Sequence, residues 1–183
     1  RYMTLIAAPK AGDTFKSGKL WYKVKTAARG TTKKTAGTVA VQKVNKNKSI
    51  RGSLTIPLTV KSKGYYYKVV TIPGNAFNGA KKLKKVTIKD NVTSIGGSAF
   101  RGCTSLTSVY IGAGVTKIEK KAFENCKKLK NIRIKSKKLK AVKAKAFRNI
   151  HKNARIRVPG SKLKAYKKIL KYKGLGKSVK ITK

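Results

Sequence analysis

The fold is decided by residues 92–111, which read VTSIGGSAFRGCTSLTSVYI. Residues 115–134 repeat the pattern and read VTKIEKKAFENCKKLKNIRI. The Ala-Phe doublet at the centre of this pattern occurs in four places, with spacings of 23, 23 and 24 residues between Phe77, Phe100, Phe123 and Phe147. A period in this range, with apolar columns kept in register, indicates a solenoid of short coils.

Several apolar columns recur with this period and predict the elements of each coil. The full pattern is V-x2-I-x3-A-F-x2-C-x2-L-x2-V-x-I. Its final V-x-I alternates buried and outward residues, which is typical of a short strand with one buried face. The V-x2-I segment predicts a second short extended stretch, and A-F-x2-C has room for a single helical turn. One coil cannot bury these columns alone, so we expect the coils to stack roughly 4.8 Å apart and form a parallel sheet.

The repeat resembles the leucine-rich repeats, because L-x-x-L-x-L maps onto residues 83–88 and onto the equivalent residues of the next coils. With A-F-x2-C in the coils, it is most similar to the BspA-like subclass of bacterial surface proteins, over about residues 54–183. It departs from that pattern at Ala80, Ile150 and Asn153, and terminal repeats are commonly atypical. The resemblance implies an α/β repeat solenoid, a short right-handed coil with a parallel sheet on one face. It also implies a non-catalytic cell-surface or secreted protein that binds or adheres to its partners.

The residues after the last coil predict a C-terminal cap. Ser161 precedes apolar residues at helical spacing and Gly174 follows them, so we expect a capping helix with Ser161 as its N-cap and Gly174 just after its end. Residues 179–181 lie 23 positions beyond residues 156–158 and repeat the V-x-I pattern. They predict one more strand in the sheet.

The N-terminal part predicts a β cap. Residues 20–26 and 38–44 alternate as strands do, residues 58–68 fit a hairpin, and residues 27–37 and 45–53 have the composition of loops. The resulting division of the chain is a tail or linker over residues 1–13, an N-terminal β-rich cap over 14–68, leucine-rich repeat coils over 69–159, and a C-terminal capping helix with the last strand over 160–183.

Charge is the second dominant feature. The chain has 48 Lys plus Arg against four acids, a net charge of +44. Such an excess attracts polyanions at long range and, through self-repulsion, favours a monomer. Only eight of these cations are Arg. Because planar bidentate recognition of anions favours Arg, the composition suggests electrostatic attachment more than group-specific recognition.

The outward residues of the predicted sheet become basic toward the C-terminal coils, and extended solenoid surfaces commonly bind partners. We therefore predict a ligand-contacting basic face on the sheet. Other Lys residues lie between the Phe column and the strands, and on the predicted helix, whose apolar side is expected to cap the core. The predicted face consists of Lys85, Lys89, Tyr110, Arg133, Lys135, Arg155, Arg157 and Lys180.

The sequence offers little for catalysis. His151 is the single His and the four acids are scattered, so we predict no enzyme, no cofactor and no metal site. Cys103 and Cys126 occupy the same column of adjacent coils. A metal site at these two residues would lack further ligands. A disulfide between them is sterically reachable. We nevertheless expect buried free thiols, because Ala80 and Ile150 fill the same column with apolar side chains.

Two classes of function remain open from the sequence. The first is an extracellular or cell-surface binding protein whose partners are cell-wall polymers, acidic glycans or host matrix proteins. The second is a nucleic-acid-binding protein that acts through non-specific phosphate contacts. The sequence has no 18-residue apolar run, so we expect no membrane span. It begins at Arg1 without Met, which suggests an excerpt of a longer product.

Overall fold

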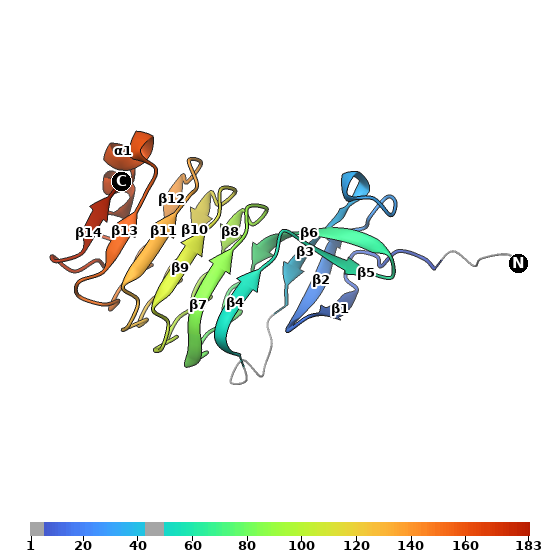
Figure 1. Cartoon of the computed structure of the whole chain (residues 1–183), viewed down its shortest axis with the longest axis horizontal. Coiled ribbons are helices and arrows are strands. Elements are labelled where there is room, and N and C mark those ends of the chain that lie inside the picture. Colours follow the sequence, from blue (N-terminus) through green and yellow to red (C-terminus); the bar gives the residue numbers. More distant parts are fainter. Residues whose placement is uncertain (1–5, 43–49) are drawn as a thin grey trace, which may run out of the picture.

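The stacked coils form two sheets that run along the molecule on different sides of the core (Figure 1). The structure is a computed structural model, and it describes residues 6–42 and 50–183. Within this part, six strands form one sheet in the order β14-β13-β11-β9-β7-β4, and all of its pairs are parallel. Its strands are β4 (Arg51–Ile56), β7 (Lys82–Ile88), β9 (Ser108–Ile111), β11 (Asn131–Ile134), β13 (Arg155–Arg157) and β14 (Lys180–Thr182).

The second sheet joins the N-terminal cap to the other side of the coils. Its order is β1-β2-β3-β6-β8-β10-β12, and β5 pairs with β6. The V-x2-I segments of successive coils form its short parallel strands, as the sequence predicts. Its strands are β1 (Thr14–Ser17), β2 (Leu20–Thr26), β3 (Gly37–Val41), β5 (Thr59–Ser62), β6 (Tyr65–Ile72), β8 (Ser94–Ile95), β10 (Lys117–Ile118) and β12 (Ala141–Val142).

The core between the sheets is a set of ladders in which equivalent residues of successive coils stack. The four Phe rings are completely buried, with centroids 5.1 Å apart for Phe77 and Phe100, 5.3 Å for Phe100 and Phe123, and 5.4 Å for Phe123 and Phe147. The interplanar angles are 15°, 1° and 3°. The predicted stacking of the coils is therefore confirmed, and each ring is shielded from water by the rings next to it.

The A-F-x2-C segments are not the single helical turns that the sequence suggests. In the first coil, the backbone N–H groups of Asn75, Phe77 and Gly79 donate to the second coil, whereas those of the residues between them donate within their own coil. An α-helix needs successive N–H groups to donate four residues back along the same chain. The segments therefore form tandem turns, and they add a third hydrogen-bonded ladder to the two sheets.

These turns require a left-handed backbone at two positions in every coil. The position two residues after each Phe is Gly79, Gly102, Asn125 or Asn149, and all four have positive φ. The position two residues before each Phe is Asn75, Ser98, Lys121 or Lys145, also with positive φ. Gly and Asn adopt this conformation readily, but it costs other L-residues roughly 1–2 kcal/mol. The third and fourth coils therefore store strain at their Lys residues.

We expect Lys121→Asn to raise the free energy of unfolding by roughly 0.5–1 kcal/mol, because Asn tolerates the left-handed backbone (φ 61°) that Lys121 adopts. Urea unfolding checks the prediction. Lys120→Asn is the matched control. It removes the same charge from an exposed neighbouring residue whose φ is not positive. Equal stabilisation by both substitutions would assign the effect to reduced charge repulsion and contradict the prediction.

The C-terminal cap is present, but its boundaries differ from the prediction. A 3-10 turn, η3 (Gly160–Lys162), leads into α1 (Leu163–Leu170), so Ser161 lies in that turn and is not the N-cap. The helix ends before Lys171, and Gly174 lies beyond a further turn at φ 92°. The Lys173 carbonyl in that turn accepts the Phe147 N–H at 3.0 Å, which continues the ladder of turns for one more coil. The chain must therefore leave the helix early to complete this ladder.

Tyr166 fixes the helix α1 to the last coils. Its side chain is 2% exposed, and its hydroxyl donates to the Ser136 carbonyl at 2.9 Å and accepts the Leu139 N–H at 3.0 Å. Leu170 is fully buried beside it, so the helix covers the end of the core (Figure 1). The fold class, including the capping helix, is therefore as predicted.

The last strand has a different register from the one that the sequence suggests. Ile181 pairs with Ile156, and Thr182 pairs with Arg157, whereas the repeat spacing places Lys180 opposite Arg157. Lys180 instead pairs with Arg155. The helix and the turn after it make this coil two residues longer than the 23-residue period that the prediction assumed.

The N-terminal cap continues the second sheet. β3 pairs in parallel with β6, and β5 and β6 form a hairpin with positive φ at both Lys63 and Gly64, as type I′ turns require. Residues 51–53 belong to β4 and not to the predicted loop, and the loop over 27–37 contains a 3-10 turn, η1 (Lys33–Thr35). The end of the predicted strand 38–44 and the start of the predicted loop 45–53 lie partly outside the described residues.

Candidate functional site

The outer face of the six-stranded sheet carries six of the eight predicted site residues in two columns, and Lys89 and Lys135 directly follow β7 and β11. Strand pairing aligns Tyr110, Arg133 and Arg157 in one column. The second column contains Lys85, Arg155 and Lys180, with Ser108 and Asn131 between them. Side chains of neighbouring strands in such columns start roughly 4.8 Å apart. The face is therefore polar and uncharged on some strands and increasingly cationic toward β13.

Two adjoining grooves cross this face. The larger, of about 640 Å³, lies at the C-terminal end and is lined by Arg133, Lys135, Arg155 and Arg157, among others. The smaller, of about 300 Å³, runs over β7, β9 and β11, and its lining includes Lys85, Tyr110 and the same three arginines. Six of the eight predicted site residues thus line the two grooves. Lys89 and Lys180 do not line either of them.

The geometry of the larger groove also brings in residues that sequence reasoning missed. Lys137 and Lys183 line it beside the arginines, and Pro159 is a partly exposed apolar residue of its lining. Lys137 follows β11 without belonging to the repeat pattern. Lys183 follows β14, whose register the repeat spacing misassigned. Neither residue occupies a repeat column, so the periodicity carried no signal for them.

One acidic group lies at the edge of this face. The Lys135 ammonium contacts the Asp90 carboxylate at 3.2 Å, and the Ala113 N–H donates to the same carboxylate at 2.8 Å. The Ala113 hydrogen bond and the Lys135 ammonium hold the pKa of Asp90 below its usual value, and Asp90 raises the pKa of Lys135. Farther along the sheet, the Arg133 guanidinium lies over the Tyr110 ring, 5.8 Å from its centroid. Lys135 and Arg133 are thus oriented by neighbours before any ligand arrives.

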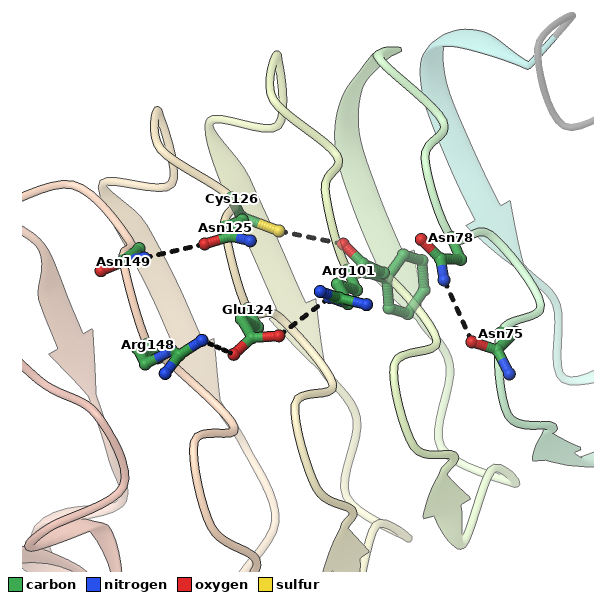
Figure 2. A network of polar contacts seen from close by, with 9 residues as sticks. Asn75, Asn78, Arg101, Glu124, Asn125, Cys126, Arg148 and Asn149 are labelled. Atoms are coloured by element: carbon green, nitrogen blue, oxygen red, sulfur yellow. Dashed lines mark hydrogen bonds and ion pairs between the residues drawn. The ribbon is translucent and has the colours of Figure 1, made fainter.

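A second charged cluster lies on the turns, away from the sheet face, and the sequence did not predict it. The Glu124 side chain is fully buried, with Arg101 Nε 2.8 Å from one carboxylate oxygen and an Arg148 Nη 2.8 Å from the other (Figure 2). These contacts pair the charges although neither has hydrogen-bond geometry. The three residues come from three successive coils, so the cluster clamps the coils together. Asn149 donates to Asn125 at 2.8 Å beside it.

Cys103 and Cys126 are buried free thiols, as predicted. The Cys126 thiol donates to the Phe100 carbonyl at 3.0 Å, and the Cys103 thiol donates to the Phe77 carbonyl at 3.2 Å. Hydrogen bonding with Cys103 and burial raise the pKa of the Cys126 thiol. The thiols therefore satisfy backbone carbonyls inside the core.

His151 lies in the last coil, where its Nδ1 accepts the Asn153 N–H at 3.1 Å. Across residues 6–42 and 50–183, no three side chains of His, Cys, Asp or Glu gather in a way that would hold a metal ion. The same part of the chain has no helix with the length and hydropathy that a bilayer-spanning segment needs.

Comparison with solved structures shows the same fold. A leucine-rich repeat protein from Bacteroides capillosus is 24% identical, with a TM-score of 0.64, and the match covers 80% of this chain and 99% of that one. One from Bacteroides ovatus is 21% identical (TM-score 0.60; 92% and 40% covered). A leucine rich cell surface protein from Faecalibacterium prausnitzii is also 21% identical (TM-score 0.52; 94% and 51% covered). The chain thus spans about half or less of the last two proteins.

Among curated proteins, none matches this chain. The family described as BspA type leucine rich repeat region matches residues 67–181, in six copies. This match covers more than half of the sequence, includes all four Phe coils, and agrees with the ladders seen in the structure. The chain therefore belongs to the BspA-type leucine-rich repeat family.

Proposed function

We propose that this protein is a non-catalytic binding or adhesion protein that works outside the cell or at its surface, and that the outer face of the six-stranded sheet contacts a polyanionic partner. The observation that carries the proposal is the convergence of Arg133, Arg155 and Arg157 in one groove with three lysines. Asp90 is the acid that contacts this face, and it is already paired with Lys135.

The three other acids do not neutralise the positive charge of this face. Glu124 is paired with two arginines on the turns, and Glu119 with Lys117 at 2.7 Å. Asp13 accepts the Lys10 N–H in the N-terminal cap. With a net charge of +44 and every acid engaged elsewhere or at the edge, an anionic ligand meets a surface of one sign. The same self-repulsion supports a monomer in dilute solution.

The family and one neighbour support the location. The BspA-like resemblance implies a bacterial surface protein, and the Faecalibacterium prausnitzii neighbour is described as a leucine rich cell surface protein. We also propose the division of the chain into an N-terminal region up to residue 68, coils over 69–159 and a C-terminal cap. In this arrangement both ends of the ladder are covered, and the sheet face stays open.

Charge reversal on the sheet face tests the proposal. We expect the variant Arg133→Glu, Arg155→Glu, Arg157→Glu to bind a polyanion such as heparin at least about tenfold more weakly than the unmodified protein at fixed salt, since it replaces direct contacts by repulsion. The matched control, Lys81→Glu, Lys127→Glu, Lys128→Glu, changes the net charge equally at exposed residues of the turn side. It should lose only the long-range part of the attraction.

Binding is measured by isothermal titration against heparin, lipoteichoic acid and DNA at matched ionic strength. Equal losses for the two variants would mean that net charge alone governs binding and would refute the sheet face as the site. Strong preference for DNA over both other polymers would favour the alternative function, nucleic-acid binding through phosphate contacts.

A further inference from the structure

The arginines of this chain are concentrated in two places, although Lys outnumbers Arg by 40 to eight. Arg101 and Arg148 hold the buried Glu124. Arg133, Arg155 and Arg157 line the larger groove together. Five of the seven arginines in the described residues thus belong to these two clusters, which leaves Arg29 and Arg51 elsewhere. The first cluster already binds a carboxylate, whereas the ion pairs of the described residues include none with Arg133, Arg155 or Arg157.

We infer that the larger groove is a specificity site that recognises the sulfate or carboxylate groups of an acidic polysaccharide through Arg133, Arg155 and Arg157. This inference rests on the proposed function and deepens it. The surrounding lysines attract any polyanion, whereas the arginines distinguish one anionic group from another.

The strand geometry places the three guanidinium groups within reach of one ligand residue. Arg133 and Arg157 are direct partners on β11 and β13, so their Cα atoms lie roughly 4.8 Å apart. Arg155 and Arg157 lie two residues apart on the same face of β13, a separation of roughly 6.6 Å. The three side chains therefore start from an area of the sheet about as large as a single sugar ring.

The chemistry of the groove requires Arg and not merely positive charge. A guanidinium presents two parallel N–H donors that match the oxygens of a sulfate or a carboxylate, whereas an ammonium acts as a point charge. The Arg101–Glu124–Arg148 cluster shows that this chain uses Arg on both sides of an oxyanion. The lining of the groove contains three further Arg residues and neither Asp nor Glu.

A polysaccharide fits the rest of the lining better than a nucleic acid does. Pro159 is a partly exposed apolar residue in the lining of the larger groove, and Tyr110 adds a ring in the adjoining groove. Single-stranded nucleic acids are bound on rows of aromatic side chains on which successive bases stack. Tyr110 is the one aromatic residue lining these two grooves, so such a row is absent from this face.

A charge-conserving substitution separates recognition from attraction. The double variant Arg155→Lys, Arg157→Lys keeps the net charge, as does the control Arg29→Lys, Arg51→Lys, whose residues lie outside both grooves. We expect the groove variant to bind a heparin octasaccharide about tenfold more weakly than the unmodified protein and the control to bind it equally well. Thermal unfolding verifies that both variants are folded.

The outcomes distinguish the possible failures. If the unmodified protein binds none of the polyanions, the proposed function fails. If it binds the octasaccharide but the groove variant binds equally well, only the specificity site is refuted. A hyaluronan oligosaccharide, which carries carboxylates without sulfates, shows which group is recognised. An equal tenfold loss for oligothymidylate, with tighter binding of that probe by the unmodified protein, would refute the polysaccharide assignment.

Discussion

Replacing Phe123 with alanine is expected to lower the free energy of unfolding by about 4 kcal/mol, within the range of 3–5 kcal/mol typical of buried Phe→Ala changes. Phe123 is fully buried and stacks on two rings, Phe100 at 5.3 Å and Phe147 at 5.4 Å. The substitution leaves a cavity between two coils whose backbones are held in place by the ladders of hydrogen bonds, so the site cannot collapse easily.

Phe77→Ala is the matched comparison, because Phe77 is equally buried but stacks on Phe100 alone. We expect it to cost roughly 0.5–1.5 kcal/mol less, the contribution of one ring pair beyond burial. Urea unfolding is the measurement, since urea leaves the ionic strength unchanged. If Phe123→Ala abolishes folding, Phe123→Leu supplies the value. A cost below about 1 kcal/mol for Phe123→Ala would contradict the stacked core.

The buried Glu124 gives the second large effect. We expect the double variant Arg101→Met, Arg148→Met to lose about 3–5 kcal/mol of stability, because it leaves a carboxylate with no exposed surface and no counter-charge. Both arginines are 44% exposed, so their own desolvation adds little to the balance. Adding Glu124→Gln to the double variant removes the orphaned charge and should recover more than half of the loss.

Lys117→Met is the control for this prediction. Lys117 and Glu119 are 2.7 Å apart, but their side chains are 47% and 31% exposed, and exposed pairs contribute at most about 1 kcal/mol. Urea unfolding at neutral pH compares the variants. Failure of Glu124→Gln to rescue the double variant would show that the stability comes from packing of the Arg side chains and not from the ion cluster.

The repeat was predictable because it is periodic. Each buried column recurs in several coils, so several residues of the sequence support the same prediction. The Phe and Cys residues lie in the structure where the period predicts them. The capping helix was predictable in kind, since its apolar residues have helical spacing. Its boundaries were not, because the turn after Lys171 is fixed by a hydrogen bond from Phe147, a contact between segments that the local pattern does not encode.

The candidate site was predictable where it follows the strand register. Arg133, Arg155 and Arg157 share a face because inward and outward residues alternate along β11 and β13. Lys180 was placed in the wrong column because the final coil is longer than the others. The Arg101–Glu124–Arg148 cluster was missed because its members occupy variable positions of the repeat, and only their stacking across coils brings them together.

Protection of lysines from amine-reactive labelling tests the central claim, that the sheet face holds the ligand, most directly. With a heparin octasaccharide bound, we expect reduced labelling at the groove residues Lys135, Lys137 and Lys183, and unchanged labelling at Lys81 and Lys127 on the turn side. Protection of the turn-side lysines with continued labelling of the groove lysines would contradict the account.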